Sequence, residues 1–228
     1  MSYFVTGTDT GVGKTLISCA LLHAFAAQGL RVVGMKPVAA GCDEDEHNED
    51  AKKLRAASNI LATYGQINPY SLFPPIAPHI AARNVGVRID LARILTSFRE
   101  LVSQADVVIV EGIGGFKVPL NEQQDSVDLM QQMELPVILV VGMRLGCINH
   151  ALLTAGAIEV SGLKLAGWVA NVLDADMAAL PDHIAALEQR LAAPLLGVVE
   201  YQAQPDARVV ATHLNVELLN KNEAADDT

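Results

Sequence analysis

The chain has 228 residues, of which 51% are hydrophobic and 18% are charged, a composition well outside the range of disordered proteins. Its 16 basic and 26 acidic residues give a net charge of −10, which argues against binding to nucleic acid or to an anionic membrane. Cys19, Cys42 and Cys147 form no C-x-x-C pair, and no apolar run approaches the roughly 18 residues of a membrane span. We therefore expect a cytoplasmic protein with one core, in which any phosphate site is locally basic.

The first elements along the chain are a strand, a glycine-rich loop, a helix and a second strand. Residues 3–6 form a short apolar strand, residues 15–28 have helical spacing that Gly29 would end, and residues 31–36 form the next strand. Further apolar runs of strand length lack strict alternation, as expected for strands covered on both faces: residues 106–110, 136–141, 163–171 and 195–199. Helical patterns separate them at about residues 88–104, 149–160 and 178–192.

This alternation predicts a doubly wound, mostly parallel α/β sheet. We expect a single domain over residues 1–219, followed by a polar, disordered tail over residues 220–228. The acidic segment DEDEHNED, residues 43–50, is expected to be a polar loop.

The loop after the first strand, GTDTGVGKT, is similar to a phosphate-binding loop with one extra residue. Five residues separate Gly7 from Gly13, where the standard pattern has four. A glycine-rich turn before a helix directs backbone N–H groups at one spot, where the helix dipole adds positive potential. Lys14 would reach the terminal phosphates, and the Thr15 hydroxyl would bind the accompanying Mg²⁺. The alternative is a glycine turn that only caps a helix.

A second lysine is predicted near the first. Lys36 ends the second strand, and ligands of open parallel sheets bind at the carboxyl ends of the strands, so Lys36 should project toward the same crevice as Lys14. A nucleoside triphosphate with Mg²⁺ is already mostly neutralised. A second lysine therefore suggests an additional anion beside the γ-phosphate. The alternative is a lysine that ends an edge strand in solvent.

Two carboxylates are candidates for Mg²⁺. Glu111 directly follows the apolar residues 107–110 and precedes the glycine-rich segment GIGG, which is the usual placement of a magnesium-ordering acid. Asp50 closes the acidic run, and on spacing alone a solvated loop is the more common role. Together with Thr15 these residues would satisfy Mg²⁺, which keeps several waters and accepts one or two carboxylates.

Seven segments between residues 3 and 197 resemble the dethiobiotin synthetases. They are YFVTGTDTGVGKT, GMKPVAAG, NPYSLFPPIAPHIAA, VIVEGIGG, LPVILVVGMRLGCINHALLT, LAGWVANV and APLLG. The five-residue spacing in the phosphate loop is itself a feature of that family, and GCINHALLTA is particularly specific to it.

The resemblance implies a P-loop nucleoside triphosphate hydrolase-like fold and a homodimeric ligase of biotin biosynthesis. Its reaction would convert 7,8-diaminopelargonic acid, CO₂ and ATP, with Mg²⁺, to dethiobiotin, ADP and phosphate, through a carbamate and a carbamic-phosphoric anhydride. The anion suggested by Lys36 would be the carbamate. No nucleic-acid or membrane partner is implied.

The resemblance also implies roles for individual residues. Lys14 and Lys36 would be catalytic, and the metal ligands would be Thr15, Asp50 and Glu111. The nucleotide would contact Gly11, Val12, Gly13, Lys14, Thr15, Leu16, Asp50, Glu111, Gly112, Ile113, Gly114, Asn171, Val172, Glu200, Tyr201 and Gln202. The organic substrate would contact Lys36 and Ala40, together with Gly146, Cys147, Ile148 and Asn149 donated by the second subunit.

The chain departs from the family pattern at three places. Some members carry a side chain with a proposed role at the position of Gly11, and a serine at the position of Ala40. Members often show a Pro-aromatic pair where this chain has Glu200, Tyr201 and Gln202. These departures put the corresponding side-chain contacts in question, whereas backbone contacts would survive them.

The sequence features argue against two other functions. A glutamine-dependent ligase of the cobyrinic-acid type needs a glutaminase domain, for which the chain has neither room nor a nucleophile. A nucleotide-switched positioning or partition ATPase usually places a lysine early in the loop, where this chain has Asp9, and often carries a basic tail, whereas residues 220–228 are acidic.

Overall fold

The computed structural model describes residues 1–45 and 47–221. Its strands are β1 (Ser2–Gly7), β2 (Val32–Met35), β3 (Val38–Ala40), β4 (Tyr70–Leu72), β5 (Val107–Glu111), β6 (Val137–Met143), β7 (Leu165–Val172) and β8 (Leu195–Val199). Its helices are α1 (Lys14–Ala27), α2 (Glu49–Ala57), α3 (Tyr64–Ile67), α4 (Pro78–Asn84), α5 (Leu91–Val102), α6 (Ser126–Met133), α7 (Cys147–Val160), α8 (Leu180–Glu188), α9 (Ala207–Ala211) and α10 (Glu217–Lys221).

The main sheet has six parallel strands in the order β2-β5-β1-β6-β7-β8. Each strand predicted from an apolar run is one of these six, so the doubly wound parallel fold is confirmed. After β1, the strands β2 and β5 lie on one side of β1 in the sheet, and the next strand of this sheet, β6, pairs with its other side. Such a reversal next to a central strand opens a crevice at the carboxyl ends of the strands. A separate parallel pair, β3 with β4, has only three residues per strand and is too short to be predicted from periodicity.

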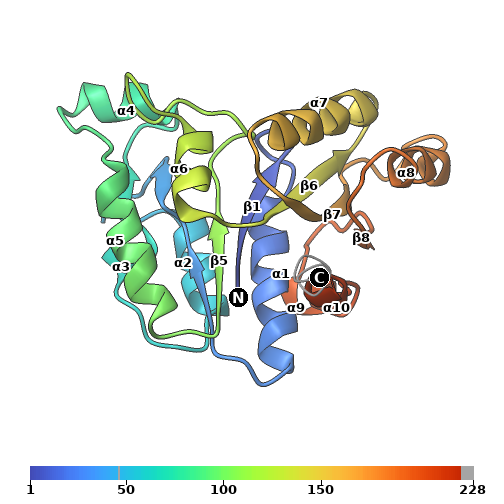
Figure 1. Cartoon of the computed structure of the whole chain (residues 1–228), viewed down its shortest axis with the longest axis horizontal. Helices are drawn as coiled ribbons and strands as arrows, with labels where there is room; N and C mark the ends of the chain where they lie inside the picture. Colours follow the sequence, from blue (N-terminus) through green and yellow to red (C-terminus); the bar gives the residue numbers. More distant parts are fainter. Residues whose placement is uncertain (46, 222–228) are drawn as a thin grey trace.

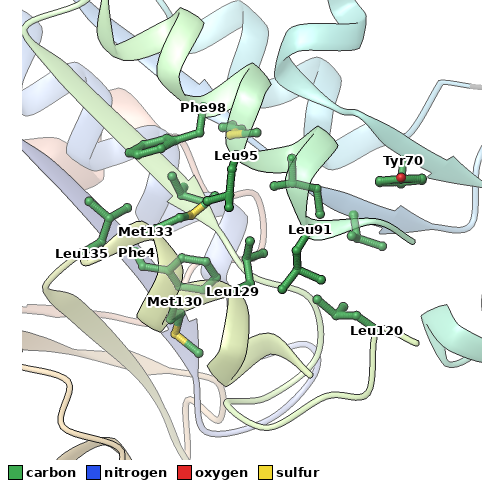
Figure 2. Close-up of a cluster of buried hydrophobic side chains, with 14 of the residues drawn as sticks. Phe4, Tyr70, Leu91, Leu95, Phe98, Leu120, Leu129, Met130, Met133 and Leu135 are labelled. Atoms are coloured by element: carbon green, nitrogen blue, oxygen red, sulfur yellow. The ribbon is translucent and has the colours of Figure 1, made fainter. Parts of the chain in front are cut away.

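Helices cover both faces of the sheet. In Figure 1, α7 lies above β6 and β7, and α9 and α10 lie below them. Successive strand residues point to opposite faces, so Phe4 of β1 packs with α5 and α6, whereas Tyr3 and Val5 pack with α1 and α2. Figure 2 shows Phe4 among side chains of α5 and α6, including Phe98 and Met130. Because both faces are buried, the strands are continuous apolar runs rather than alternating ones.

Helix α2 begins inside the segment that was predicted to be a polar loop, so this prediction was wrong for its last two residues. Glu49 and Asp50 form the first turn of α2. Asn48 caps the helix, because its side-chain Oδ1 accepts hydrogen bonds from the backbone N–H groups of Asp50 at 3.0 Å and Ala51 at 3.4 Å. Asparagine at this position and carboxylates in the first turn both favour a helix start. Asp50 is thereby held on a helix end.

Other element ends also differ from the predicted ones by a few residues. Helix α5 begins at Leu91 because Asp90 caps it. Helix α6, which starts from a capping box between Asp125 and Asp128, was not predicted. Helix α10 includes the first two residues of the predicted tail, and residues 222–228 lie outside the described part of the chain. No helix among the described residues is long and apolar enough to span a bilayer.

The packing of α2 predicts the effect of Leu54→Ala. Leu54 is fully buried in the cluster formed by α1, α2 and the sheet, so the substitution removes buried methyl groups and leaves a cavity. We expect a loss of about 2–5 kcal/mol in the free energy of unfolding, measured by urea denaturation. Leu61→Ala is the matched control because Leu61 is 95% exposed, and it should change stability by less than about 0.5 kcal/mol. Equal losses in the two variants would contradict this account of the packing.

Candidate active site

A crevice of about 320 Å³ lies at the carboxyl ends of β1, β2 and β5. This is the edge at which open parallel sheets bind ligands. The crevice is lined by Thr10, Gly11, Gly13, Lys14, Thr15, Lys36, Ala40, Asn48, Asp50, Glu111, Ile113 and Gly114. The two lysines, the threonine and the two carboxylates predicted from the sequence therefore share one cavity.

The loop between β1 and α1 depends on two glycines with left-handed backbone. Gly11 has φ 74° and Gly13 has φ 92°, values that other residues rarely adopt. The side-chain amide of Asn171, at the end of β7, packs against Gly13 and donates to the carbonyl of Val12 at 2.8 Å. Strand β7, two positions from β1 in the sheet, thus holds the loop, whose backbone N–H groups lie at the positive end of α1.

Lys14 is buried, and its ammonium group turns back onto backbone carbonyls beside the loop. Its Nζ donates to the carbonyl of Asp9 at 2.9 Å and to the carbonyl of Gly114. Burial, and to a lesser degree the neighbouring Lys36, lower the pKa of Lys14 to about 8. Lys14 is therefore a buried cation with too little compensating charge, which is the condition that favours an incoming phosphate.

Lys36 forms the centre of a buried ion-pair network. Its Nζ lies 2.5 Å from Glu111 Oε1 and 3.1 Å from Asp50 Oδ2, and it donates to the carbonyl of Gly112 at 3.1 Å. Burial alone would lower the pKa of Lys36, but Glu111 and Asp50 raise it above its usual value. For Asp50, burial works to raise the pKa, but Lys36 and the Thr15 hydroxyl lower it. The lysine is thus charged and held between the two carboxylates.

The crevice also meets the requirements of Mg²⁺. Glu111 Oε1 accepts the Thr15 hydroxyl at 2.8 Å, whereas Glu111 Oε2 is buried without a hydrogen-bond partner. A buried carboxylate oxygen without a partner is costly unless a cation or donor satisfies it. Two carboxylates and a hydroxyl are hard oxygen ligands of the kind Mg²⁺ prefers, so the donor set fits the ion.

Asn48 is a site residue that sequence reasoning missed. Its side chain lines the crevice, caps α2 through the first-turn N–H groups, and donates to the carbonyl of Gly41 at 3.1 Å. It therefore joins the end of β3 to the helix that carries Asp50. An asparagine followed by Glu-Asp is a helix-start signal, which could have revealed both Asn48 and the fixed place of Asp50.

Several predicted residues lie outside this crevice. Leu16 lines a second cavity of about 310 Å³, which Thr15 also borders, between α1, α2 and residues 205–208. Asn171 and Val172 end β7, and residues 200–202 follow β8. Residues 146–149 lie at the start of α7. The contacts predicted for these residues with the adenine and with the substrate carboxylate stay predictions.

The low pKa of Lys14 has a consequence for stability. Its pKa is about 8 in the folded protein and 10.5 when unperturbed, so below pH 8 the folded state holds this proton less favourably than the unfolded chain does. This penalty disappears as the pH rises from 8 to 10.5. We expect Lys14→Met to raise the free energy of unfolding at pH 7 by roughly 1–3 kcal/mol and to approach the wild-type value near pH 10.5, measured by urea denaturation without nucleotide.

The exposed Lys117 offers the matched control for this measurement, and Lys117→Met should follow the wild type within about 0.5 kcal/mol at both pH values. A stability difference for Lys14→Met that does not change with pH would contradict the assignment.

Comparison with known proteins shows the family to which the chain belongs. Residues 1–208 match the family model described as "AAA domain". The ATP-dependent dethiobiotin synthetase BioD of Nitrosospira multiformis is 59% identical over 214 residues, which cover 94% of each chain. The protein of the same name from Aromatoleum aromaticum is 53% identical over 218 residues, covering 94% of this chain and 97% of that one.

The fold has wider relatives. The MinD cell division protein of Aquifex aeolicus superimposes with a TM-score of 0.58, covering 98% of this chain and 97% of its own, at 14% identity. That likeness concerns the fold alone. The high identity over nearly the full length, together with the phosphate loop and the paired lysines and carboxylates, establishes that the chain belongs to the ATP-dependent dethiobiotin synthetase family.

Proposed function

We propose that this protein is an ATP-dependent ligase that closes the ureido ring of dethiobiotin from 7,8-diaminopelargonic acid and CO₂. The observation that carries the proposal is the buried Lys36, placed with Asp50 and Glu111 in the same crevice as the phosphate loop. A nucleotide hydrolase has no evident use for a second buried ammonium group beside the metal carboxylates. A reaction that holds an extra anion next to the γ-phosphate requires one.

The proposed reaction has three steps. One substrate amine attacks CO₂, forms a C–N bond and loses a proton, which gives a carbamate anion. A carbamate oxygen then attacks the γ-phosphorus and displaces ADP, which yields a carbamic-phosphoric anhydride. The second amine finally attacks the carbonyl carbon, loses a proton and expels phosphate, which closes the five-membered ring. No covalent enzyme intermediate is involved, so the protein contributes positioning and charge.

The residues of the crevice fit these steps. Lys14, now bonded to loop carbonyls, would turn to the β- and γ-phosphates, while the N–H groups of residues 11–16 surround them. Lys36 would hold the carbamate and balance the charge that develops on the transferred phosphoryl group. Residues 112–114 follow Glu111, and Ile113 and Gly114 of this segment line the cavity.

Thr15, Asp50 and Glu111 would hold Mg²⁺, which supplies charge neutralisation of the β- and γ-phosphates when it is bound with ATP. The same two carboxylates now pair with Lys36. Because Asp50 and Glu111 would then be shared with the metal ion, the Lys36 ammonium group would be free to pair with the carbamate.

We further propose that the protein acts as a homodimer. Helix α7 starts at Cys147 after Gly146, which has φ 94°, so the backbone N–H groups of Gly146, Ile148 and Asn149 lie at the positive end of the helix, where they can receive the substrate carboxylate. Leu145 is 91% exposed and Val160 is 90% exposed, at the two ends of this helix. Exposed apolar side chains along one element favour burial against a second subunit. The predicted cytoplasmic location accords with this reading.

The alternative function, a nucleotide-switched positioning ATPase, has less support. Its solved relatives share the fold at 14–18% identity, whereas the dethiobiotin synthetases reach 59%. The loop also carries Asp9 where such ATPases usually have a lysine.

The role of Lys36 predicts the behaviour of Lys36→Met. Wild-type protein should release ADP only when both the diamine and bicarbonate are present. The variant should form dethiobiotin about 100-fold more slowly or worse, with ATP affinity changed only a few-fold, because the lost charge faces the carbamate. Product formation and ATP binding are measured separately.

Lys164→Met is the control for this experiment, because Lys164 directly precedes β7 and so lies at the amino-terminal end of a strand, away from the crevice. The Lys164→Met variant should form dethiobiotin at a rate near that of the wild type. Near-normal ring closure by Lys36→Met would remove Lys36 from the mechanism. ADP release without the diamine would favour the switch ATPase.

The dimer proposal predicts that two defective variants complement each other. Lys36→Met disables the subunit that binds ATP, and Asn149→Asp places a charge that repels the substrate carboxylate in the subunit that donates residues 146–149. When equal amounts are unfolded, mixed and refolded, half of the dimers are hybrids with one intact site, so about a quarter of wild-type activity should return. If Asn149 acts within its own subunit, no activity returns.

A further inference from the structure

A half-exposed ion pair joins the phosphate loop to the segment that follows β6. Asp9 Oδ2 accepts a hydrogen bond from Arg144 Nη2 at 2.6 Å, and the two side chains are 49% and 44% exposed. Asp9 Oδ1 accepts the backbone N–H of Thr10 at 2.7 Å. The carbonyl of Asp9 accepts the ammonium group of Lys14 at 2.9 Å. Asp9 thus contacts both Lys14 and Arg144.

Arg144 occupies a defined place on the neighbouring strand. It directly follows β6, which pairs with β1 in the sheet, and its carbonyl accepts the N–H of Cys147 at 3.0 Å. It therefore belongs to the turn that starts α7, one residue before Leu145 and two before Gly146. The ion pair connects this turn with the loop that wraps the phosphates.

The position of Asp9 poses an electrostatic problem. A carboxylate within the loop that receives a triphosphate repels that ligand, in a protein that already has a net charge of −10. The N–H of Thr10, and then the guanidinium of Arg144, lower the pKa of Asp9, with a smaller effect of His150, so Asp9 stays charged at neutral pH. Among the ion pairs of the described residues, the one that involves the Asp9 carboxylate is formed with the guanidinium of Arg144.

We propose that Arg144 is a positioning residue for nucleotide binding: it neutralises the Asp9 carboxylate and ties the phosphate loop to the turn between β6 and α7. Arg144 acts through Asp9 and does not touch the phosphates. The proposal rests on the proposed function only in that the loop binds ATP. The pair contributes little to stability, because exposed ion pairs are worth about 0–1 kcal/mol.

The test measures the affinity of each variant for ATP with Mg²⁺, without the diamine, by titration calorimetry. Arg144→Ala should weaken ATP binding about five-fold, because the Asp9 carboxylate is left uncompensated beside the phosphates. Adding Asp9→Asn to Arg144→Ala should reverse most of that loss, because the repelling charge is gone. Arg144→Lys should retain most of the affinity, and the loss in Arg144→Ala should shrink at high salt.

The double variant separates this mechanism from direct contact. If Arg144 binds a phosphate itself, the variant with both substitutions stays as weak as Arg144→Ala, and the proposal is overturned. In turnover assays the effect should appear in the KM for ATP, with kcat changed less. An unchanged ATP affinity in Arg144→Ala also overturns the proposal.

The Arg31–Asp106 pair supplies the matched control. Its atoms lie 2.7 Å apart, its side chains are 60% and 37% exposed, and it joins the amino-terminal ends of β2 and β5, away from the crevice. Arg31→Ala should leave ATP affinity within error of the wild type. An equal loss there would assign the effect to general destabilisation. Because the deciding measurement is ATP binding, a protein that binds ATP but does not close the ring would refute the proposed function and leave this inference standing.

Discussion

The buried contact between Lys36 and Glu111 organises the site, because neither charge is tolerated in the protein interior without the other. The two residues lie at the ends of β2 and β5, which are neighbours in the sheet. Thr15 from α1 and Asp50 from α2 complete the network. Elements distant in the sequence are thus held together at one point. The remaining free oxygen of Glu111 and the weakly compensated charge of Lys14 leave the network incomplete in a way that fits a cation and a phosphate.

The charges around the crevice differ in their exposure, and this separates their roles. Lys14, Lys36 and Glu111 are buried, so their interactions are strong and little screened by salt. Asp9 and Arg144 lie at the rim, about half exposed, where an ion pair adds little stability but still changes the local potential. The inner residues are suited to the reacting groups, and the outer pair is suited to the approach and placement of the nucleotide.

Much of the site followed from the sequence because parallel strands end at the same edge of the sheet. A lysine after one apolar run, a glutamate after another and a glycine loop after a third must then meet, and Lys36, Glu111 and Lys14 do. Asp50 is placed only through the family resemblance when the segment that starts its helix is interpreted as a loop, although the helix-start signal of Asn48 precedes it. The contact between Asp9 and Arg144 spans 135 residues and follows no local pattern, so periodicity could not predict it.

The sequence by itself determined the succession of the main strands along the chain, the phosphate loop and the identity of the chemical groups. These features depend on local spacing and on burial patterns that repeat along each element. Only the tertiary structure decided which groups touch: that Lys36 lies between two carboxylates, that Asn171 supports Val12, and that Arg144 pairs with Asp9. Such contacts depend on the order in which the strands lie in the sheet and on the resulting distances of a few ångströms. No local property of the chain encodes those distances, since they arise from the packing of all elements at once.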